Sequence, residues 1–199
     1  MTFPLLILAA NVILSIACFN NQELFYKLDF QPYEILRKKE WYRFITHAFM
    51  HADYTHLAVN MYVLYFFGES VYEAYTYYFQ DQGLVFFVLL YFGGILFSSI
   101  PGFVKNRENY SYHAVGASGA VSAVVYAFIV MFPFNKMSLL FIPIEFPAWV
   151  FGIGYLALEI YLDKNSKSNI AHSAHYFGGI YGLILTILLH PEFVLKYFI

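Results

Sequence analysis

The stretch that decides the fold class is Leu84–Val104, which reads LVFFVLLYFGGILFSSIPGFV and carries no charged side chain. A helix needs about 20 mostly apolar residues to cross the hydrocarbon core of a bilayer, and this stretch is long enough. The whole chain has the same character: of its 199 residues, 60% are hydrophobic and 12% are charged, and the mean hydropathy is +0.58. Soluble domains are about half apolar and about a quarter charged. The composition therefore indicates a polytopic membrane protein in a lipid bilayer and argues against a soluble or disordered chain.

Six apolar stretches predict an all-α bundle of six transmembrane helices. They lie at about residues 2–19, 56–79, 84–104, 115–132, 137–162 and 173–189. Pro143 and Pro147 interrupt the first part of the fifth stretch, so we expect a hairpin at the membrane interface there. Six spans use roughly 120 positions, which leaves no room for a second domain. Residues 1–199 are therefore predicted to form one membrane domain.

The connection at residues 20–55 is long and rich in charged side chains interleaved with aromatic and aliphatic ones. A structureless loop of that length is uncommon in a compact domain. We therefore expect short helices at the membrane interface, anchored by Trp41, Tyr42 and Tyr54. Residues 2–19 lack the basic start of a signal peptide and are interpreted as a retained span.

The charges give two further indications. The net charge is −2 and there is no run of basic residues, so we expect no nucleic-acid partner. Most lysines and arginines lie in the loops after the first, third and fifth helices, and the positive-inside rule places such loops in the cytoplasm.

Polar side chains inside apolar helices are candidates for function, because an unpartnered polar group in hydrocarbon is costly. The candidates are His56, Asn60, Ser118, His172 and His175. All lie in the first turns of the second, fourth and sixth helices. Since helices alternate in direction, these first turns lie on the same side of the membrane and at a similar depth.

Ser118 lies between two glycines in Gly116-Ala117-Ser118-Gly119, at an expected helix start. Free backbone N–H groups beside its hydroxyl could bind a developing oxyanion. The tetrapeptide alone favours close helix packing, in which Gly116 and Gly119 let two helices approach each other and Ser118 is a small residue at their contact.

His175 makes a catalytic interpretation of Ser118 more specific. It is followed by Gly178, Gly179 and Gly182, which form one small-residue stripe along the sixth helix. If this stripe packs on the fourth helix, imidazole and hydroxyl come within hydrogen-bond reach as base and nucleophile. The alternative is a buried histidine that bonds a backbone carbonyl. His172, three residues earlier, is expected nearer water as a helix cap.

His56 and Asn60 are four residues apart and share one helical face, where they could stabilise negative charge. Capping or packing at a helix start is the alternative. No aspartate lies inside any span, so a Ser–His dyad is favoured over a triad. His47 and His51 have the spacing of a metal pair but lack further ligands, and they are interpreted as loop residues near the interface.

Together these residues resemble the motifs of the rhomboid family of intramembrane serine proteases. The similarity comprises Trp41-Tyr42-Arg43, the His47–His51 segment, His56-x-x-x-Asn60, Gly116-x-Ser118-Gly119, and Ala174-His175 with Gly178 and Gly182. Each motif is weak alone, but the set in this order covers nearly the whole chain. The likeness is to a minimal, six-helix, bacterial-type core.

The resemblance implies that Ser118 is the nucleophile and His175 the general base of an endopeptidase. It implies an oxyanion hole formed by His56, Asn60 and the Ser118 backbone N–H. It also implies a structural role for Arg43, and for Gly116, Gly119, Gly178 and Gly182 as support. Single-span membrane proteins would be the substrates, and no metal or organic cofactor is expected.

The resemblance further implies an integral, multi-pass protein of the bacterial cytoplasmic membrane with the charge-rich loops outside, opposite to the positive-inside rule. In such proteases the fifth helix, here about Phe146–Leu162, and the loop after it form the substrate gate. The alternative function is a catalytically inactive rhomboid-like protein that binds membrane clients as a chaperone or scaffold. The sequence does not determine the oligomeric state.

Overall fold

The computed structural model describes residues 1–138, 144–166 and 171–197. Apart from one short hairpin, the described residues form helices and their connections, as expected for an all-α protein. The long helices are α1 (Phe3–Phe19), α5 (Tyr54–Phe79), α6 (Gly83–Asn106), α7 (Ser118–Met131), α8 (Ala148–Asn165) and α9 (His172–Leu189). The short 3₁₀ turn η2 (Gln80–Gln82) joins α5 to α6, and α10 (Glu192–Leu195) follows α9.

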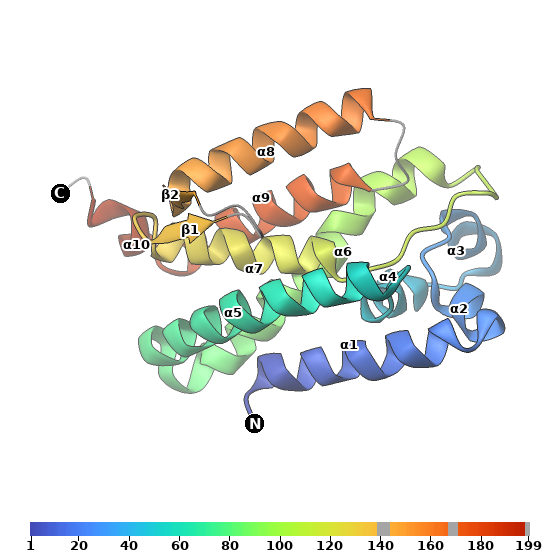
Figure 1. Cartoon of the computed structure of the whole chain (residues 1–199), viewed down its shortest axis with the longest axis horizontal. Helices are drawn as coiled ribbons and strands as arrows, with labels where there is room; N and C mark the ends of the chain where they lie inside the picture. Colours follow the sequence, from blue (N-terminus) through green and yellow to red (C-terminus); the bar gives the residue numbers. More distant parts are fainter. Residues whose placement is uncertain (139–143, 167–170, 198–199) are drawn as a thin grey trace.

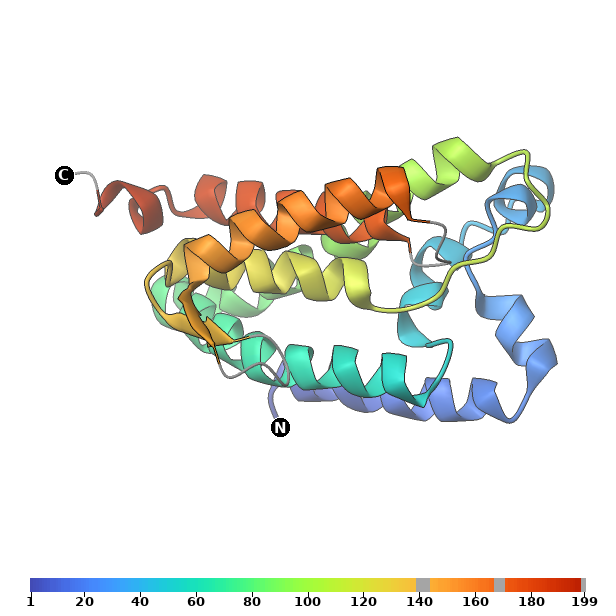
Figure 2. The same ribbon diagram turned by 45° about the horizontal axis from the view of Figure 1, so that its top comes forward.

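α7 is the central helix of the bundle. It packs most extensively on α9 and also contacts α5, α6 and α8. In Figure 2 it lies between α5 on one side and the pair α8 and α9 on the other. Nearly all its side chains are buried, including Ala120, Ala123 and Ala127. A helix that is apolar all round is one that neighbours enclose on every side.

The first connection folds into short helices, as the sequence predicts. They are α2 (Gln22–Leu28), α3 (Pro32–Lys38), α4 (Arg43–Thr46) and the 3₁₀ turn η1 (His47–Phe49). Trp41, Tyr42 and Tyr54 are exposed there. Figure 1 shows this group at the end of the bundle where α5, α7 and α9 begin. The first turns of these three helices therefore lie on one side, as expected from their alternating directions.

Two expected helix boundaries are corrected. The fifth helix begins at Ala148 and not at Met137, because β1 (Lys136–Ser138) pairs with β2 (Glu145–Pro147) in an antiparallel hairpin. Pro147 directly precedes the helix; Pro143 lies outside the described residues. The fourth helix begins at Ser118 and not at Val115, because Gly116 has φ of 123°, a conformation that helices exclude.

Many large apolar side chains face outward on the long helices. They include Leu6, Ile13, Val85, Leu89, Phe97, Ile153, Ile184 and Leu188. Within the described chain, two stretches are long and apolar enough to cross a membrane by length and composition, Tyr54–Asn106 and His172–Leu189. α1 and α7 are apolar but shorter. The six-span count therefore stays a prediction.

Candidate active site

Ser118 and His175 are brought together by the packing of α7 on α9. The His175 Nε2 atom lies 2.9 Å from the Ser118 Oγ atom, within hydrogen-bond distance. Ser118 is the first residue of α7 and His175 lies in the first turn of α9. The first N–H groups of a helix have no acceptor within that helix, so the Ser118 hydroxyl stands beside backbone donors.

The small-residue stripe of α9 explains how the two side chains approach so closely. A Cβ atom added at Gly178 would overlap the Gly119 carbonyl oxygen. One added at Gly182 would lie 2.6 Å from the Ala123 Cα atom. Real carbon atoms prefer separations of about 3.5–4.0 Å. The two helices therefore touch backbone to backbone, as predicted if the stripe packs on α7.

His56 and Asn60 lie on the same cavity as Ser118 and His175. His56 is in the first turn of α5, where the Asp53 carboxylate accepts a hydrogen bond from its backbone N–H at 2.7 Å. The imidazole lies against Gly116, at which an added Cβ would be 2.6 Å from the His56 Cε1 atom. The Asn60 side chain is buried, and its amide donates to the His56 carbonyl at 2.9 Å. One amide hydrogen of Asn60 remains for a ligand.

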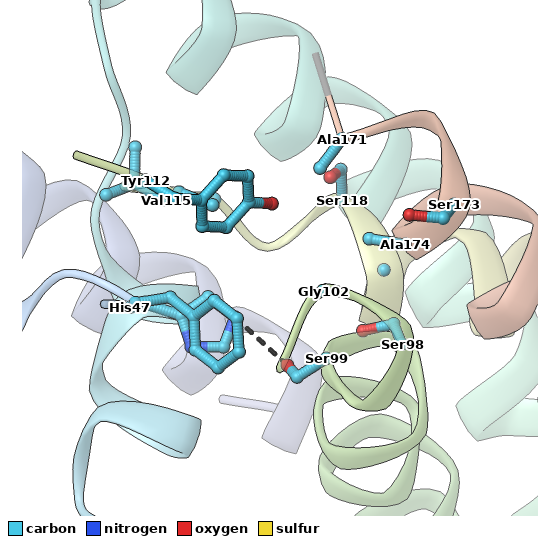
Figure 3. Close-up of a pocket in the computed structure, with 14 residues that line it drawn as sticks. His47, Ser98, Ser99, Gly102, Tyr112, Val115, Ser118, Ala171, Ser173 and Ala174 are labelled. Atoms are coloured by element: carbon cyan, nitrogen blue, oxygen red, sulfur yellow. Dashed lines mark hydrogen bonds between the residues drawn. The ribbon is translucent and has the colours of Figure 1, made fainter. Parts of the chain in front are cut away.

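This cavity has a volume of about 850 Å³ and is mostly apolar. It is lined by side chains of α5, α7 and α8, such as Val63, Val125 and Phe151. A second, much smaller cavity of about 40 Å³ lies on another side of Ser118. Figure 3 shows Ser98, Ser99 and Tyr112 around it, with Ser118 at its edge. That volume is enough for a water molecule.

The first connection supports the segment before Ser118. The His47 carbonyl accepts a hydrogen bond from the Gly116 N–H at 2.9 Å, and the His51 Nε2 atom accepts from the Ala117 N–H at 3.4 Å. Both histidines lie in the connection before α5 and are buried within the protein. Burial disfavours the charged ring, and it lowers the pKa of His47 to about 4 and that of His51 to about 3.

Arg43 holds the first connection together. Its guanidinium is buried and donates to the carboxylates of Asp29 and Glu40, each at 2.6 Å. It also donates to the backbone carbonyls of Tyr26 and Asp29 at 2.9 Å. These contacts join α2, the turn after it and α4, so the arginine acts on structure at a distance from Ser118.

Sequence reasoning missed one residue near the pair. Glu159 of α8 places its Oε1 atom 3.1 Å from the Nδ1 atom of His175 and its Oε2 atom 2.6 Å from the Nδ1 atom of His172. The preference for a Ser–His dyad rested on the absence of aspartates from the spans and did not consider Glu159. A glutamate inside an apolar helix was the available signal.

The expected exposure of His172 is also corrected. Its side chain is 8% exposed and that of His175 is 15% exposed. His172 therefore lies deeper in protein than its neighbour, because α8 covers it.

Comparison with known proteins agrees with the motifs. The sequence-family model of the rhomboid domain matches residues 38–192, a range that includes all the residues of the candidate site. The chain is 32% identical over 150 residues to RHOMBOID-like protein 12, mitochondrial, of Arabidopsis thaliana, a match that covers 67% of this chain and 42% of the relative. It is 32% identical over 151 residues to the putative rhomboid protease YdcA of Bacillus subtilis, covering 75% of this chain and 67% of the relative.

A third relative is the presenilin-associated rhomboid-like protein, mitochondrial, of Homo sapiens. It is 27% identical over 143 residues, covering 68% of this chain and 35% of the relative. The chain thus spans less than half the length of the Arabidopsis and human relatives. Since the family model matches well over half of its residues, the chain belongs to the rhomboid family.

Proposed function

We propose that this protein is an intramembrane serine endopeptidase that cleaves transmembrane segments of other membrane proteins. The observation that carries the proposal is the 2.9 Å contact between the Ser118 Oγ and His175 Nε2 atoms beside a large apolar cavity. A serine hydroxyl is a weak nucleophile until a base takes its proton, and an imidazole nitrogen at this distance can do so.

The chemistry follows from the two side chains. The Ser118 Oγ atom attacks the carbonyl carbon of the scissile peptide while its proton moves to the His175 Nε2 atom. That proton passes to the leaving nitrogen as the C–N bond breaks, which releases an amine and leaves an acyl ester on Ser118. A water molecule, deprotonated by His175, then hydrolyses the ester. The small cavity beside Ser118 is large enough for such a water.

The developing oxyanion needs donors that are already in place. We assign this role to the Ser118 backbone N–H and to the side chains of His56 and Asn60, which line the same cavity. The support is their shared cavity and the position of Ser118 at the N-terminus of α7. Gly116 is required for this arrangement, because its φ of 123° turns the chain into α7 and a side chain there would collide with His56.

The cavity and the outer surface support a substrate that comes from the bilayer. The cavity of about 850 Å³ is lined by α5 and α8 and is predominantly apolar, which suits an unwound, apolar peptide segment. We propose that the six long helices all cross the bilayer. Large apolar side chains face outward on α1, α5, α6, α8 and α9, which surround α7, and such surfaces are rare in water. A single-span membrane protein could then enter between α5 and α8. We propose a bacterial cytoplasmic membrane as its location, since one relative is a bacterial protein; the Arabidopsis and human relatives are mitochondrial by name.

The test is cleavage of a model single-span substrate by purified protein in detergent, comparing the wild type with Ser118→Ala. Ser122→Ala is the matched control, because Ser122 lies one turn further along α7 and lines the same cavity. We expect cleavage by the wild type and by Ser122→Ala, none by Ser118→Ala, and no effect of a metal chelator. A fluorophosphonate should label Ser118. Cleavage that persists in Ser118→Ala would refute the serine mechanism, and a wild type that binds the substrate without cutting it would favour the inactive, client-binding alternative.

A further inference from the structure

Glu159 has an unusual position for a charged side chain. α8 lies on the outside of the bundle, along α9 (Figure 1), and its buried residues are Ala148, Gly152 and Glu159. Of these three buried residues only Glu159 carries a charge, and its side chain is 7% exposed. A buried carboxylate is costly unless partners compensate its charge. Its location is therefore explained by what it contacts.

The contacts come from one face of α9. The Oε2 atom of Glu159 lies 2.6 Å from the Nδ1 atom of His172, and the Oε1 atom lies 3.1 Å from the Nδ1 atom of His175. His172 and His175 are three residues apart, so their side chains project from the same face of the helix. Tyr155, one turn earlier on α8, also interacts with Glu159. The Glu159 carboxylate thus contacts both the His175 ring, which faces Ser118, and the His172 ring beside it.

The proton positions follow from the contact with Ser118. To accept the hydroxyl proton, the His175 Nε2 atom must carry a lone pair, so the Nδ1 atom must carry the proton of the neutral ring. The Nδ1 atom is buried and makes no aligned hydrogen bond to any described residue. The carboxylate oxygen at 3.1 Å is the acceptor within reach. Hydrogen bonds of this kind are often poorly aligned in a free enzyme and tighten when substrate binds.

We propose that Glu159 is a positioning residue that holds His175 in the tautomer and orientation needed to deprotonate Ser118. This inference rests on the proposed function, in which Ser118 is the nucleophile and His175 the base. When Ser118 transfers its proton to the Nε2 atom, the ring becomes an imidazolium whose Nδ1–H faces the carboxylate. Glu159 remains ionised throughout, and the Nε2 proton goes on to the leaving nitrogen. His172 contacts the other carboxylate oxygen of Glu159 and so holds the orientation of the carboxylate.

The same three side chains could instead be ligands of a metal ion. Two imidazoles and a carboxylate are a set that Zn²⁺ accepts, and their candidate ligand atoms lie within 4.8 Å of one another. Donors around a tetrahedral Zn²⁺ at about 2.0–2.2 Å sit roughly 3.3 Å apart. The 2.6 Å contact with His172 is that of a charge-assisted hydrogen bond. We therefore favour the hydrogen-bonded arrangement, and the metal site becomes an outcome of the test.

The experiment measures the rate at which a fluorophosphonate labels Ser118, together with kcat and KM for the model substrate. The variants are Glu159→Gln and Glu159→Asp, and Glu73→Gln on an exposed part of α5 is the control. We expect Glu159→Gln to lower the labelling rate and kcat by about 10²-fold or more, while KM changes by less than about threefold. Glu159→Asp should recover part of the rate, because it restores a carboxylate set back by one methylene. Glu73→Gln should label and cleave like the wild type.

The labelling rate separates this inference from the proposed function. A wild type that is labelled but cuts no substrate argues against the proposed function, while the comparison of labelling rates still decides the role of Glu159. A folded Glu159→Gln protein labelled at the wild-type rate overturns the inference. If Glu159→Gln does not fold, Glu159→Asp decides: an intermediate rate supports the inference and a wild-type rate overturns it. Stoichiometric zinc in the purified wild type, with labelling that accelerates when the zinc is chelated, would overturn it in favour of an inhibitory metal site.

Discussion

The backbone contact between α7 and α9 can be tested with one methyl group. In Gly178→Ala the new Cβ atom would overlap the Gly119 carbonyl oxygen and would lie 2.8 Å from the carbonyl carbon. Because carbon atoms prefer about 3.5–4.0 Å, the two helices must separate locally by about 1 Å. Overpacking of this kind costs about 1–3 kcal/mol. For a protein of 150–250 residues, each kcal/mol shifts Tm by about 2–4 °C, so Tm should fall by roughly 2–12 °C.

The same displacement acts on the proposed catalytic pair, Ser118 and His175. Gly178 lies one turn after His175, and Gly119 directly follows Ser118. A shift of about 1 Å would lengthen the 2.9 Å contact between the Ser118 and His175 side chains beyond hydrogen-bond distance, and a misplacement of that size can cost about 10²-fold in rate. We therefore expect a greater effect on substrate cleavage than on thermal stability.

Both quantities are measured on purified protein in detergent, by thermal unfolding and by cleavage of the model substrate. Gly154→Ala in α8 is the matched control, because a Cβ there would meet no atom of the described residues within 4 Å. It should keep the Tm and the activity of the wild type or gain slightly from the better helix propensity of alanine. A Gly178→Ala protein with unchanged Tm and unchanged activity would refute the close packing deduced here.

Two further predictions concern the proposed oxyanion donors and the buried His47 of the first connection. His56→Ala and Asn60→Ala should each lower kcat by roughly 10- to 10²-fold, somewhat less than the loss of a donor in soluble serine proteases, because the other donors remain. Val59→Ala is the control, since Val59 lines the same cavity. Unchanged kcat in both the His56 and Asn60 variants would contradict the assignment. In the folded protein, burial lowers the pKa of His47 to about 4, below the ordinary 6.5. Between these two pH values the unfolded chain binds a proton at His47 that the folded protein does not bind. The free energy of unfolding should therefore fall by up to about 3 kcal/mol as pH drops from about 6.5 to 4. Thermal unfolding in that range should be less pH-dependent in His47→Gln than in the wild type. Equal slopes would show that folding does not lower the pKa of His47.

Most of the helices could be predicted from the local hydrophobicity of the sequence. Long apolar stretches such as Leu84–Val104 locate helices, because each residue in hydrocarbon must satisfy its own backbone and a helix does so within one segment. The exceptions are boundaries set by single backbone conformations. The start of α7 at Ser118 depends on the φ of Gly116. The prolines predict a hairpin before α8, but the residue at which α8 begins depends on how β1 pairs with β2.

The sequence by itself determined the membrane class, the helical bundle and the side of the bundle on which Ser118 and His175 lie. Hydrophobic length and the alternation of helix direction are local or additive properties, and the glycine stripe after His175 marks where a backbone can approach. The tertiary structure decided that Glu159 reaches both His172 and His175, and that His47 and His51 are buried beneath the segment before Ser118. These contacts depend on how α8 is rotated about its axis and on how the first connection folds back. Such rotations are fixed by packing between segments far apart in the chain, so no local pattern specifies them.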